Sequence, residues 1–179
     1  RTTAWISMHQ KGQDGLWRQL VTTPGFIGRR GLGKQQEGDE KTPVGVFHLG
    51  RAFGNDPDPG CALPYIHTDA DLYWSGDPRP GMQYNRLVRL SELPELDTGR
   101  SEHLVDYGDC YAYCLDIGYN PEGTVGLGSA LFFHCLSPSH PYTAGCVAIP
   151  KGVMRRVMTL VRPGCLMVID SLENLGGHF

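Results

Sequence analysis

Short apolar runs separated by glycine and proline dominate the chain and predict strands joined by turns. Residues 3–8 and 16–21 are β-prone, and a turn is predicted at Thr23-Pro24-Gly25 after the second of them. A further strand is predicted at residues 44–49, directly after Thr42-Pro43. The abundance of Gly (24 residues) and Pro (13 residues) also favours a β-rich fold with many turns.

The clearest patterns lie in the second half of the chain. Residues 111–119 alternate between apolar and polar positions, as a half-buried strand does. Residues 130–136 form a nearly continuous apolar run, which is typical of a strand buried on both faces. A last strand is predicted at residues 166–169. Between them, one helix that ends at Pro163-Gly164 is predicted from apolar residues at helical intervals, namely Val153, Met154, Val157, Met158 and Val161.

Two segments lack such periodicity. Residues 28–41 are rich in glycine and charge and predict an exposed loop. Residues 53–86 contain many turn formers and several aromatic residues, and an excursion of this length is usually a functional loop or lid rather than a second domain. No repeat or interdomain linker is visible. We therefore expect residues 1–179 to form one mainly β domain with a single helix near its C-terminal end.

Composition narrows the functional classes. The 179 residues are 40% hydrophobic and 20% charged, as in ordinary globular proteins. A net charge of −3 without a basic stripe argues against nucleic-acid binding. The sequence contains no run of about 18 apolar residues, so no membrane span is predicted. The sequence begins with Arg1 rather than Met, so we expect any signal or anchor to lie outside this segment.

The cysteines do not form a dense disulfide framework for a chain of this size, and we expect most of them to be small buried residues. On a strand, Cys110 and Cys114 would lie about 13 Å apart, too far to bridge each other. Pairing among the others stays open. The six positions are Cys61, Cys110, Cys114, Cys135, Cys146 and Cys165.

The chemistry is concentrated in residues 129–150. A buried strand leads into His134, a polar loop follows, and Gly145-Cys146 opens a second apolar stretch. A thiol attacks a carbonyl as thiolate, and a neighbouring imidazole is the usual base. The Cys146 amide and a preceding amide could then form an oxyanion hole. From the residues alone, a core histidine and a small buried cysteine are the favoured interpretation.

Two other motifs have weaker support. Gly28-x4-Gly33-Lys34 imitates a phosphate-binding loop, but Gln35 stands where Ser or Thr would hold Mg²⁺, and no helical pattern follows. A zinc site is disfavoured because adjacent strand residues point to opposite faces. We therefore expect neither a metal nor a cofactor. The zinc ligands considered are His134, Cys135, His140 and Cys146.

The context of the cysteine adds a family resemblance. The segment T-A-G-C-V-A, preceded by F-F-H, resembles the active-site motif of L,D-transpeptidase catalytic domains of the YkuD type. The stretch G-K-Q-Q-E-G-D-E-K-T-P-V-G-V-F is similar to a second family motif. Y-W-S-G-D-P, Tyr84-Asn85, Gly128-Ser129-Ala130 and the C-terminal helix and strand also fall in the expected order, so the resemblance covers nearly the whole chain.

The resemblance implies a cysteine acyltransferase that acts on peptidoglycan stem peptides, on a β-sandwich-like mixed sheet. By position, Cys146 would be the nucleophile and His134 the base, and backbone carbonyl groups near Cys135 would orient the imidazole. The enzyme would act outside the cytoplasm, at the cell envelope, and a carbapenem-type β-lactam would acylate it. The residues implied to shape the oxyanion site through main-chain amides are Thr143, Ala144 and Gly145.

Substrate contacts are less determined. The aromatic segment at residues 65–84, with Trp74 and Tyr84, is predicted either to roof the active site or to form a surface loop. Lys34 and Glu37 either contact substrate or are solvated. His140 lies in a Ser/Pro-rich loop, and we expect it to be solvent-exposed and not catalytic.

Two departures from the family pattern leave the reaction open. Ala144 stands where the commonest motif has His, and Ala148 stands where it has Arg or Asn. The alternative functions are a hydrolase on the same scaffold, either an L,D-carboxypeptidase or an amidase-like enzyme, and a catalytically silent wall-binding module. The presence of both Cys146 and His134 argues against the silent module.

Overall fold

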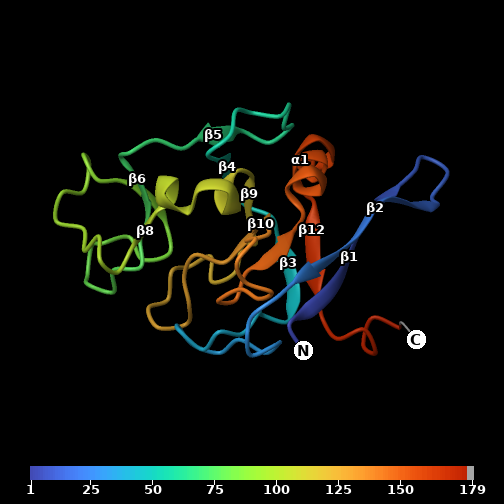
Figure 1. Ribbon diagram of the computed structural model, residues 1–179, viewed down its shortest axis with the longest axis horizontal. Helices are drawn as coiled ribbons and strands as arrows, with labels where there is room; N and C mark the ends of the chain where they lie inside the picture. Colours follow the sequence, from blue (N-terminus) through green and yellow to red (C-terminus); the bar gives the residue numbers. More distant parts are fainter. Residues whose placement is uncertain (177–179) are drawn as a thin grey trace.

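A seven-stranded mixed sheet forms the centre of the protein. The computed structural model describes residues 1–176 (Figure 1). Across the sheet the strands run β1 (Thr3–Lys11), β2 (Trp17–Phe26), β11 (Val147–Ile149), β10 (Phe132–Cys135), β9 (Cys114–Asp116), β4 (Ala52–Gly54) and β5 (Tyr65–His67). The pairs β10–β11 and β4–β5 are parallel, and the other pairs are antiparallel.

Two smaller sheets and two helices complete the described structure. β12 (Leu166–Ile169) pairs antiparallel with β3 (Gly45–His48). β6 (Leu72–Trp74) lies between β7 (Leu87–Arg89) and β8 (Glu102–His103). The helices are the 3₁₀-helix η1 (Leu104–Tyr111) and the α-helix α1 (Lys151–Leu160). Figure 1 shows the β6–β8 region and the β1–β2 hairpin at opposite ends of the molecule.

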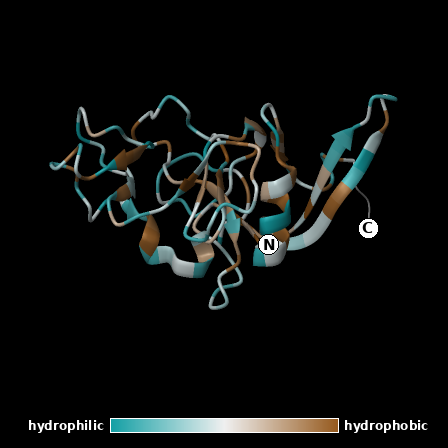
Figure 2. Cartoon of the chain, turned by 90° about the horizontal axis from the view of Figure 1, so that it is seen from above, coloured by the Kyte–Doolittle hydropathy of each residue, from teal (hydrophilic) through white to brown (hydrophobic). Residues whose placement is uncertain are grey.

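The central sheet has a core on each face because successive strand residues point to opposite sides. Phe133 and Cys135 of β10 belong to an aliphatic core that also contains Met154 and Met158 of α1. Phe132, which precedes them on β10 and points to the other face, belongs to a second core rich in aromatic side chains. Seen from above, the end of the β1–β2 hairpin projects from the rest of the chain, and the hairpin carries hydrophilic and hydrophobic positions (Figure 2).

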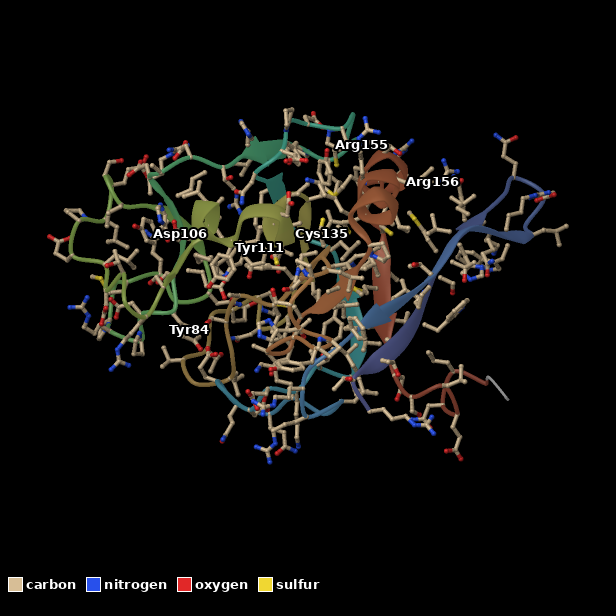
Figure 3. All side chains as sticks on the ribbon, viewed as in Figure 1. Tyr84, Asp106, Tyr111, Cys135, Arg155 and Arg156 are labelled. Carbon is tan, nitrogen blue, oxygen red and sulfur yellow. The ribbon has the colours of Figure 1, made fainter. Side chains whose placement is uncertain are left out.

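Several sequence predictions are confirmed. The fold is mainly β, and strands occupy the predicted segments at residues 44–49, 130–136 and 166–169. The predicted helix is α1, and its apolar positions Met154, Val157 and Met158 are buried. Arg155 and Arg156, on the other side of α1, point outward (Figure 3). No helix within residues 1–176 is long and apolar enough to cross a membrane.

The predicted turn at Thr23-Pro24-Gly25 is wrong. These residues continue β2, and Pro24 lies opposite Trp5 of β1. The strand continues because it crosses β11 here, with Phe26 paired to Ala148. A Cβ on Gly25 would lie 2.5 Å from the Ala148 carbonyl oxygen, so the close approach of the two strands requires glycine.

The strand predicted at residues 111–119 is largely wrong. Only Cys114–Asp116 form β9, and Tyr111 ends η1. Tyr113, Leu115 and Ile117 are nevertheless buried in one core, as their alternation indicates. Alternation reports which side chains are buried, whereas strand assignment requires a paired neighbour. The 13 Å spacing argument therefore does not apply to Cys110, which lies in η1.

The segment at residues 53–86 was predicted as a loop, but it contributes to β4 and contains β5 and β6. Strands of three residues are too short to show a period of two. Residues 28–41 are irregular as predicted, although part of this loop is buried: the side chain of Lys34 is 2% exposed.

The expectation that most cysteines are buried holds for only half of them. Cys61, Cys110 and Cys165 are half-buried, and the other three are buried. None of the six, all within the described residues, is in a disulfide.

Candidate active site

Strand register places Cys146 beside β10. β10 and β11 run parallel with His134 opposite Ala148, and Cys146 immediately precedes β11. The backbone N–H of Phe132 donates to Cys146 Sγ at 3.3 Å, and the thiol donates to the carbonyl oxygen of Ala130 at 3.4 Å. The sulfur is therefore held by main-chain groups of the segment that leads into His134.

The glycine before the cysteine is required by the backbone. Gly145 has a φ of +147°, which disfavours residues with a side chain. A Cβ at this position would lie 2.9 Å from the Lys41 carbonyl oxygen and 3.0 Å from Leu131 Cδ2. The loop that contains Gly145 and Cys146 therefore packs directly against the backbone of residues 41–42.

Thr42 anchors this loop and was missed as a site residue. Its buried hydroxyl accepts a hydrogen bond from the Gly28 N–H and donates one to the Gly145 carbonyl, both at 2.8 Å. The Thr-Pro dipeptide was interpreted only as the start of a strand. Its place in the second family motif was the available signal, but nothing in that motif indicates a contact with a residue 103 positions later.

Thr143 organises the same loop from within. Its hydroxyl donates to the Cys146 carbonyl at 2.6 Å and accepts from the Gly145 N–H at 3.1 Å. The Gly145 amide is thereby occupied. The amides of Ala144 and Cys146 have no hydrogen-bond partner within the described residues, so they are the main-chain donors available to an oxyanion.

His134 has one ring nitrogen committed to the backbone. Nδ1 lies 2.8 Å from the carbonyl oxygen of Cys135, an arrangement that assigns the Nδ1 proton to this bond and leaves Nε2 as acceptor. The ring of Tyr111 packs edge-on to the imidazole at 5.3 Å between centroids. Tyr111 and Cys135 are labelled near the centre of Figure 3.

Burial favours the neutral forms of both His134 and Cys146. Burial lowers the pKa of His134 to about 4, partly offset by the carbonyl groups of Cys135 and Cys110. Burial, followed by the charge of Glu102, raises the pKa of Cys146 to about 12, while the Phe132 N–H and Lys34 oppose this rise. The arrangement favours a thiol that loses its proton to the imidazole during attack rather than a preformed ion pair.

Both groups line one cleft of about 560 Å³. Ala144 lies at its exposed wall, and His140 at its rim is exposed, as predicted. Lys34 also lines the cleft, but its ammonium is paired with Asp39 at 3.0 Å and donates to the Gln36 carbonyl at 3.1 Å. The alternative that Lys34 is solvated is therefore wrong.

The family comparison agrees with this geometry. The family model of the L,D-transpeptidase catalytic domain (YkuD) matches residues 6–169, which include both His134 and Cys146. The chain belongs to this family. No curated protein and no solved structure matches the chain.

The two aromatic residues proposed as substrate contacts occupy different places in this L,D-transpeptidase domain. Trp74 lines the cleft, packs on Phe132 and donates its indole N–H to Asn85 at 2.9 Å. Tyr84 is buried and donates its hydroxyl to Glu37, which itself lines the cleft. Tyr84 lies apart from Tyr111 in Figure 3. Its hydrogen bond to Glu37 connects it to the cleft, so it supports the cleft wall through that residue.

Asn85 is a second positioning residue that was missed. Its side-chain oxygen accepts from the Ala130 N–H at 3.1 Å as well as from Trp74. Ala130 has a positive φ of 54°, and its carbonyl accepts from the Cys146 thiol. Asn85 therefore connects the aromatic wall to the backbone that holds the sulfur. Tyr84-Asn85 was noted only as part of the family resemblance.

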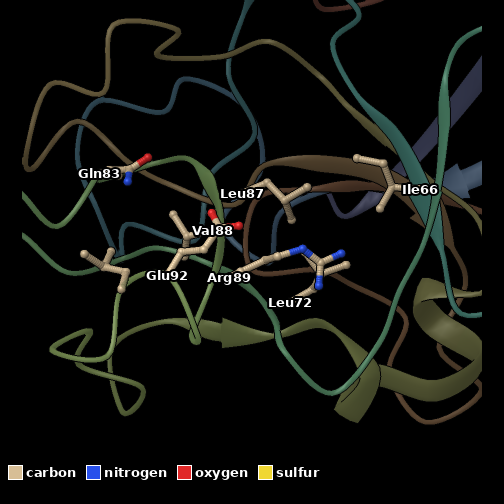
Figure 4. A pocket seen from close by; sticks show the side chains of 8 residues that line it. Ile66, Leu72, Gln83, Leu87, Val88, Arg89 and Glu92 are labelled. Atoms are coloured by element: carbon tan, nitrogen blue, oxygen red, sulfur yellow. The ribbon is translucent and has the colours of Figure 1, made fainter.

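Other parts of the L,D-transpeptidase domain offer no competing centre. A second cavity of about 310 Å³ lies against β6 and β7, and Ile66, Leu72, Leu87 and Arg89 are among its lining residues (Figure 4). It contains no cysteine or histidine. Among residues 1–176, no three His, Cys, Asp or Glu side chains are grouped so that they could hold a metal ion.

Proposed function

We propose that the chain is a cysteine acyltransferase of peptidoglycan stem peptides, with Cys146 as nucleophile and His134 as base. The observation that carries this proposal is the shared cleft: it is lined both by a thiol held by backbone groups and by an imidazole whose Nδ1 is bonded to the Cys135 carbonyl. Membership of the L,D-transpeptidase family supports the same assignment. We also propose that residues 1–179 form one catalytic domain and act at the cell envelope, where this substrate occurs.

The first half-reaction forms a thioester. As Sγ of Cys146 attacks the carbonyl carbon of the third residue of a donor stem, Nε2 of His134 takes the thiol proton. The amides of Ala144 and Cys146 donate to the developing oxyanion. When the tetrahedral adduct collapses, the C–N bond breaks and the imidazolium returns its proton to the leaving amine of D-alanine.

The second half-reaction decides between transferase and hydrolase. A neutral amine of another stem attacks the thioester carbon while His134 takes a proton from the attacking nitrogen; as the new C–N bond forms the C–S bond breaks, and the imidazolium returns the proton to Sγ, which regenerates the thiol. Water in place of the amine would make the enzyme an L,D-carboxypeptidase or an amidase-like hydrolase. Ala148 lines the cleft and Ala144 its wall, both without the polar groups of the commonest family motif, which keeps this second function in consideration.

Mass analysis of products tests these functions. Purified tetrapeptide stems are incubated with the protein, with and without a stem that supplies an acceptor amine. A cross-linked product that appears only with the acceptor supports the transferase. Loss of D-alanine without cross-linking identifies the hydrolase. Unchanged peptides would contradict both and leave the silent wall-binding module.

A further inference from the structure

Glu102 is a carboxylate in the cleft without a cationic partner. It lies on β8, lines the same cleft as Cys146 and His134, and accepts a hydrogen bond from the Tyr111 hydroxyl at 2.7 Å. Across the described part of the chain, no Lys, Arg or His nitrogen lies within 4.0 Å of its carboxylate.

Three other charged groups of the cleft are already paired. Lys34 contacts Asp39 at 3.0 Å, and Glu40 lies 3.7 Å from Arg29. Arg100, the remaining cation of the cleft wall, contacts Asp97 at 3.3 Å. Glu37 interacts with the neutral hydroxyl groups of Tyr84 and Ser129, and it is exposed. Glu102 therefore differs from its neighbours: it is half-buried beside the nucleophile, and neutral groups alone contact it.

The negative charge of Glu102 disfavours formation of the Cys146 thiolate. Its charge is the second-largest cause, after burial, of the raised pKa of Cys146. Burial also raises the pKa of Glu102 itself to about 7, a rise that the phenols of Tyr111 and Tyr107 partly offset and Glu37 increases. A negative charge beside a thiol disfavours the thiolate, so a cation that neutralises Glu102 would favour attack.

The aromatic groups around Glu102 suit an ammonium group. Tyr107 stacks on Tyr111 with 4.2 Å between centroids and 11° between planes, and Tyr107 is 39% exposed. Both rings line the cleft, and Tyr111 also packs against His134. A carboxylate near the exposed ring of Tyr107 combines ionic and cation–π attraction for an alkylammonium.

We propose that Glu102 binds the side-chain ammonium of a diamino acid at the third position of the stem peptide, and that this pairing promotes attack by Cys146. The inference rests on the proposed function and names the substrate feature that the cleft recognises: a free amine on an alkyl chain. A peptide without this amine leaves the negative charge beside the thiol in place. Glu102 thus determines substrate specificity, and neutralisation of its charge raises the reactivity of Cys146.

Binding to the inactive variant tests recognition without requiring turnover. Calorimetry with Cys146→Ala compares a stem tetrapeptide that has lysine at its third position with the same peptide acetylated on that lysine. The free amine is expected to bind about tenfold more tightly, and Glu102→Gln added to Cys146→Ala should remove this preference. Glu40→Gln, which changes a cleft carboxylate already close to Arg29, is the matched control and should keep it.

A second measurement concerns the thiol alone. Glu102→Gln retains an oxygen that can accept from Tyr111 but removes the charge, so iodoacetamide should alkylate Cys146 several-fold faster than in the unmodified protein at pH 8. The charged or titratable groups that line the cleft together with Glu102 are Lys34, Glu37, Glu40, Arg100, Tyr107, Cys110, Tyr111, His134, His140, Tyr142 and Cys146. None of these is altered in the comparison.

The outcomes separate the inference from the proposed function. Equal binding of the two peptides, or a preference that survives Glu102→Gln, overturns the role of Glu102 while leaving stem peptides as substrates. An unchanged alkylation rate overturns the electrostatic part. If neither peptide binds to Cys146→Ala, the proposed function on stem peptides fails, and the role of Glu102 fails with it.

Discussion

Cys135 and Cys146 lie on or beside neighbouring strands and are both buried, yet they belong to opposite faces of the central sheet. Burial is the largest cause of a raised pKa at each thiol, to about 11 for Cys135 and about 12 for Cys146. Neither burial nor thiol acidity therefore distinguishes the nucleophile. The distinction is the cleft: Cys146 lines it together with His134, whereas Cys135 Sγ contacts the Tyr113 carbonyl at 3.7 Å inside the core.

The two faces also differ in the side chains that fill them. The face toward α1 is largely aliphatic, with Met154, Val157 and Met158 packed against the sheet. The face toward the cleft is aromatic, with pairs of rings 4.8 to 6.4 Å apart among Phe53, Trp74, Tyr111 and Phe132. Aromatic side chains are rigid, and those of Tyr and Trp carry polar groups that can hold carboxylates and amides. This face can therefore support a polar site that the aliphatic face cannot.

Alanine substitutions at the two cysteines should give the largest contrast. Cys146→Ala is expected to abolish turnover and keep the fold, because the thiol supplies the bond-forming atom. Cys135→Ala should retain turnover and lower the free energy of unfolding by about 1 kcal/mol, because it removes packing volume from the core. Product formation and urea denaturation measure the two effects. Turnover in Cys146→Ala would rule out the nucleophile assignment.

A carbapenem should locate the reactive thiol directly. Its strained ring carbonyl resembles the scissile amide, so we expect one added drug mass on the intact protein and its loss in Cys146→Ala. Cys110 is a sharper control than Cys135, because it is half-buried and lines the same cleft as Cys146. Unlike Cys146, it is not preceded by a glycine that shapes the proposed oxyanion site. Peptide mapping that places the adduct on Cys110, with Cys146 unmodified, would contradict the proposal.

Substitution of each of the two histidines that line the cleft tests which of them is the base. His134→Gln should lower the rate by at least about 100-fold, the usual contribution of a general base. His140→Gln should change it little, because His140 is exposed at the rim and contacts Tyr142, not the sulfur. The steady-state rates of the two variants decide the assignment, and the opposite order would transfer the role of base to His140.

Protonation of His134 should also affect stability. Its pKa is about 4 in the folded protein and 6.5 when unperturbed, so the unfolded state binds more protons between these values. The free energy of unfolding therefore falls as the pH falls through this window, by about 2 kcal/mol from pH 7 to pH 4.5 for this residue. The folded-state pKa values of Glu102 and Asp116 are raised, to about 7 and about 6, and these groups act in the opposite direction.

Subtraction isolates the histidine, because Glu102 and Asp116 are present in both proteins. Urea denaturation at the two pH values should show that His134→Gln has lost the acid-dependent destabilisation, whereas His140→Gln keeps it. Equal pH dependence in the unmodified protein and His134→Gln would contradict the burial of a neutral imidazole.

The sequence predicted most of what lies on β10 and β11 and little of what surrounds them. A continuous apolar run is sufficient to predict a buried strand, and a following Gly-Cys pair indicates a nucleophile loop. Thr42 and Asn85 act through contacts with residues distant in the chain, because Thr42 bonds Gly145 and Asn85 bonds Ala130. Glu102 contacts Tyr111 only nine residues later, but its place in the cleft beside segments distant in the chain is set by the fold.

Short strands explain the remaining errors. The strands β4 to β6 have three residues each, so pairing with neighbours determines them more than local periodicity does. Pro24 likewise remains in β2 because tertiary contact with β11 outweighs the local preference for a turn. The Gly145-Cys146 motif is local and could be recognised from the sequence, whereas the wall of the cleft is formed by segments distant in the chain.

The smallest predicted effect concerns the close backbone approach at Gly145, next to Cys146. Gly145→Ala should lower turnover about tenfold, because its Cβ would meet the Lys41 carbonyl at 2.9 Å and a small shift of the loop misplaces the sulfur. Gly15→Ala is the matched control: its φ of +80° imposes similar backbone strain, but nothing lies within 4 Å of the added Cβ and the residue is in the β1–β2 hairpin. Both variants should lose about 1 kcal/mol of stability from the positive φ, and only Gly145→Ala should lose activity. Equal activity of the two variants would show that the close approach at Gly145 does not position Cys146.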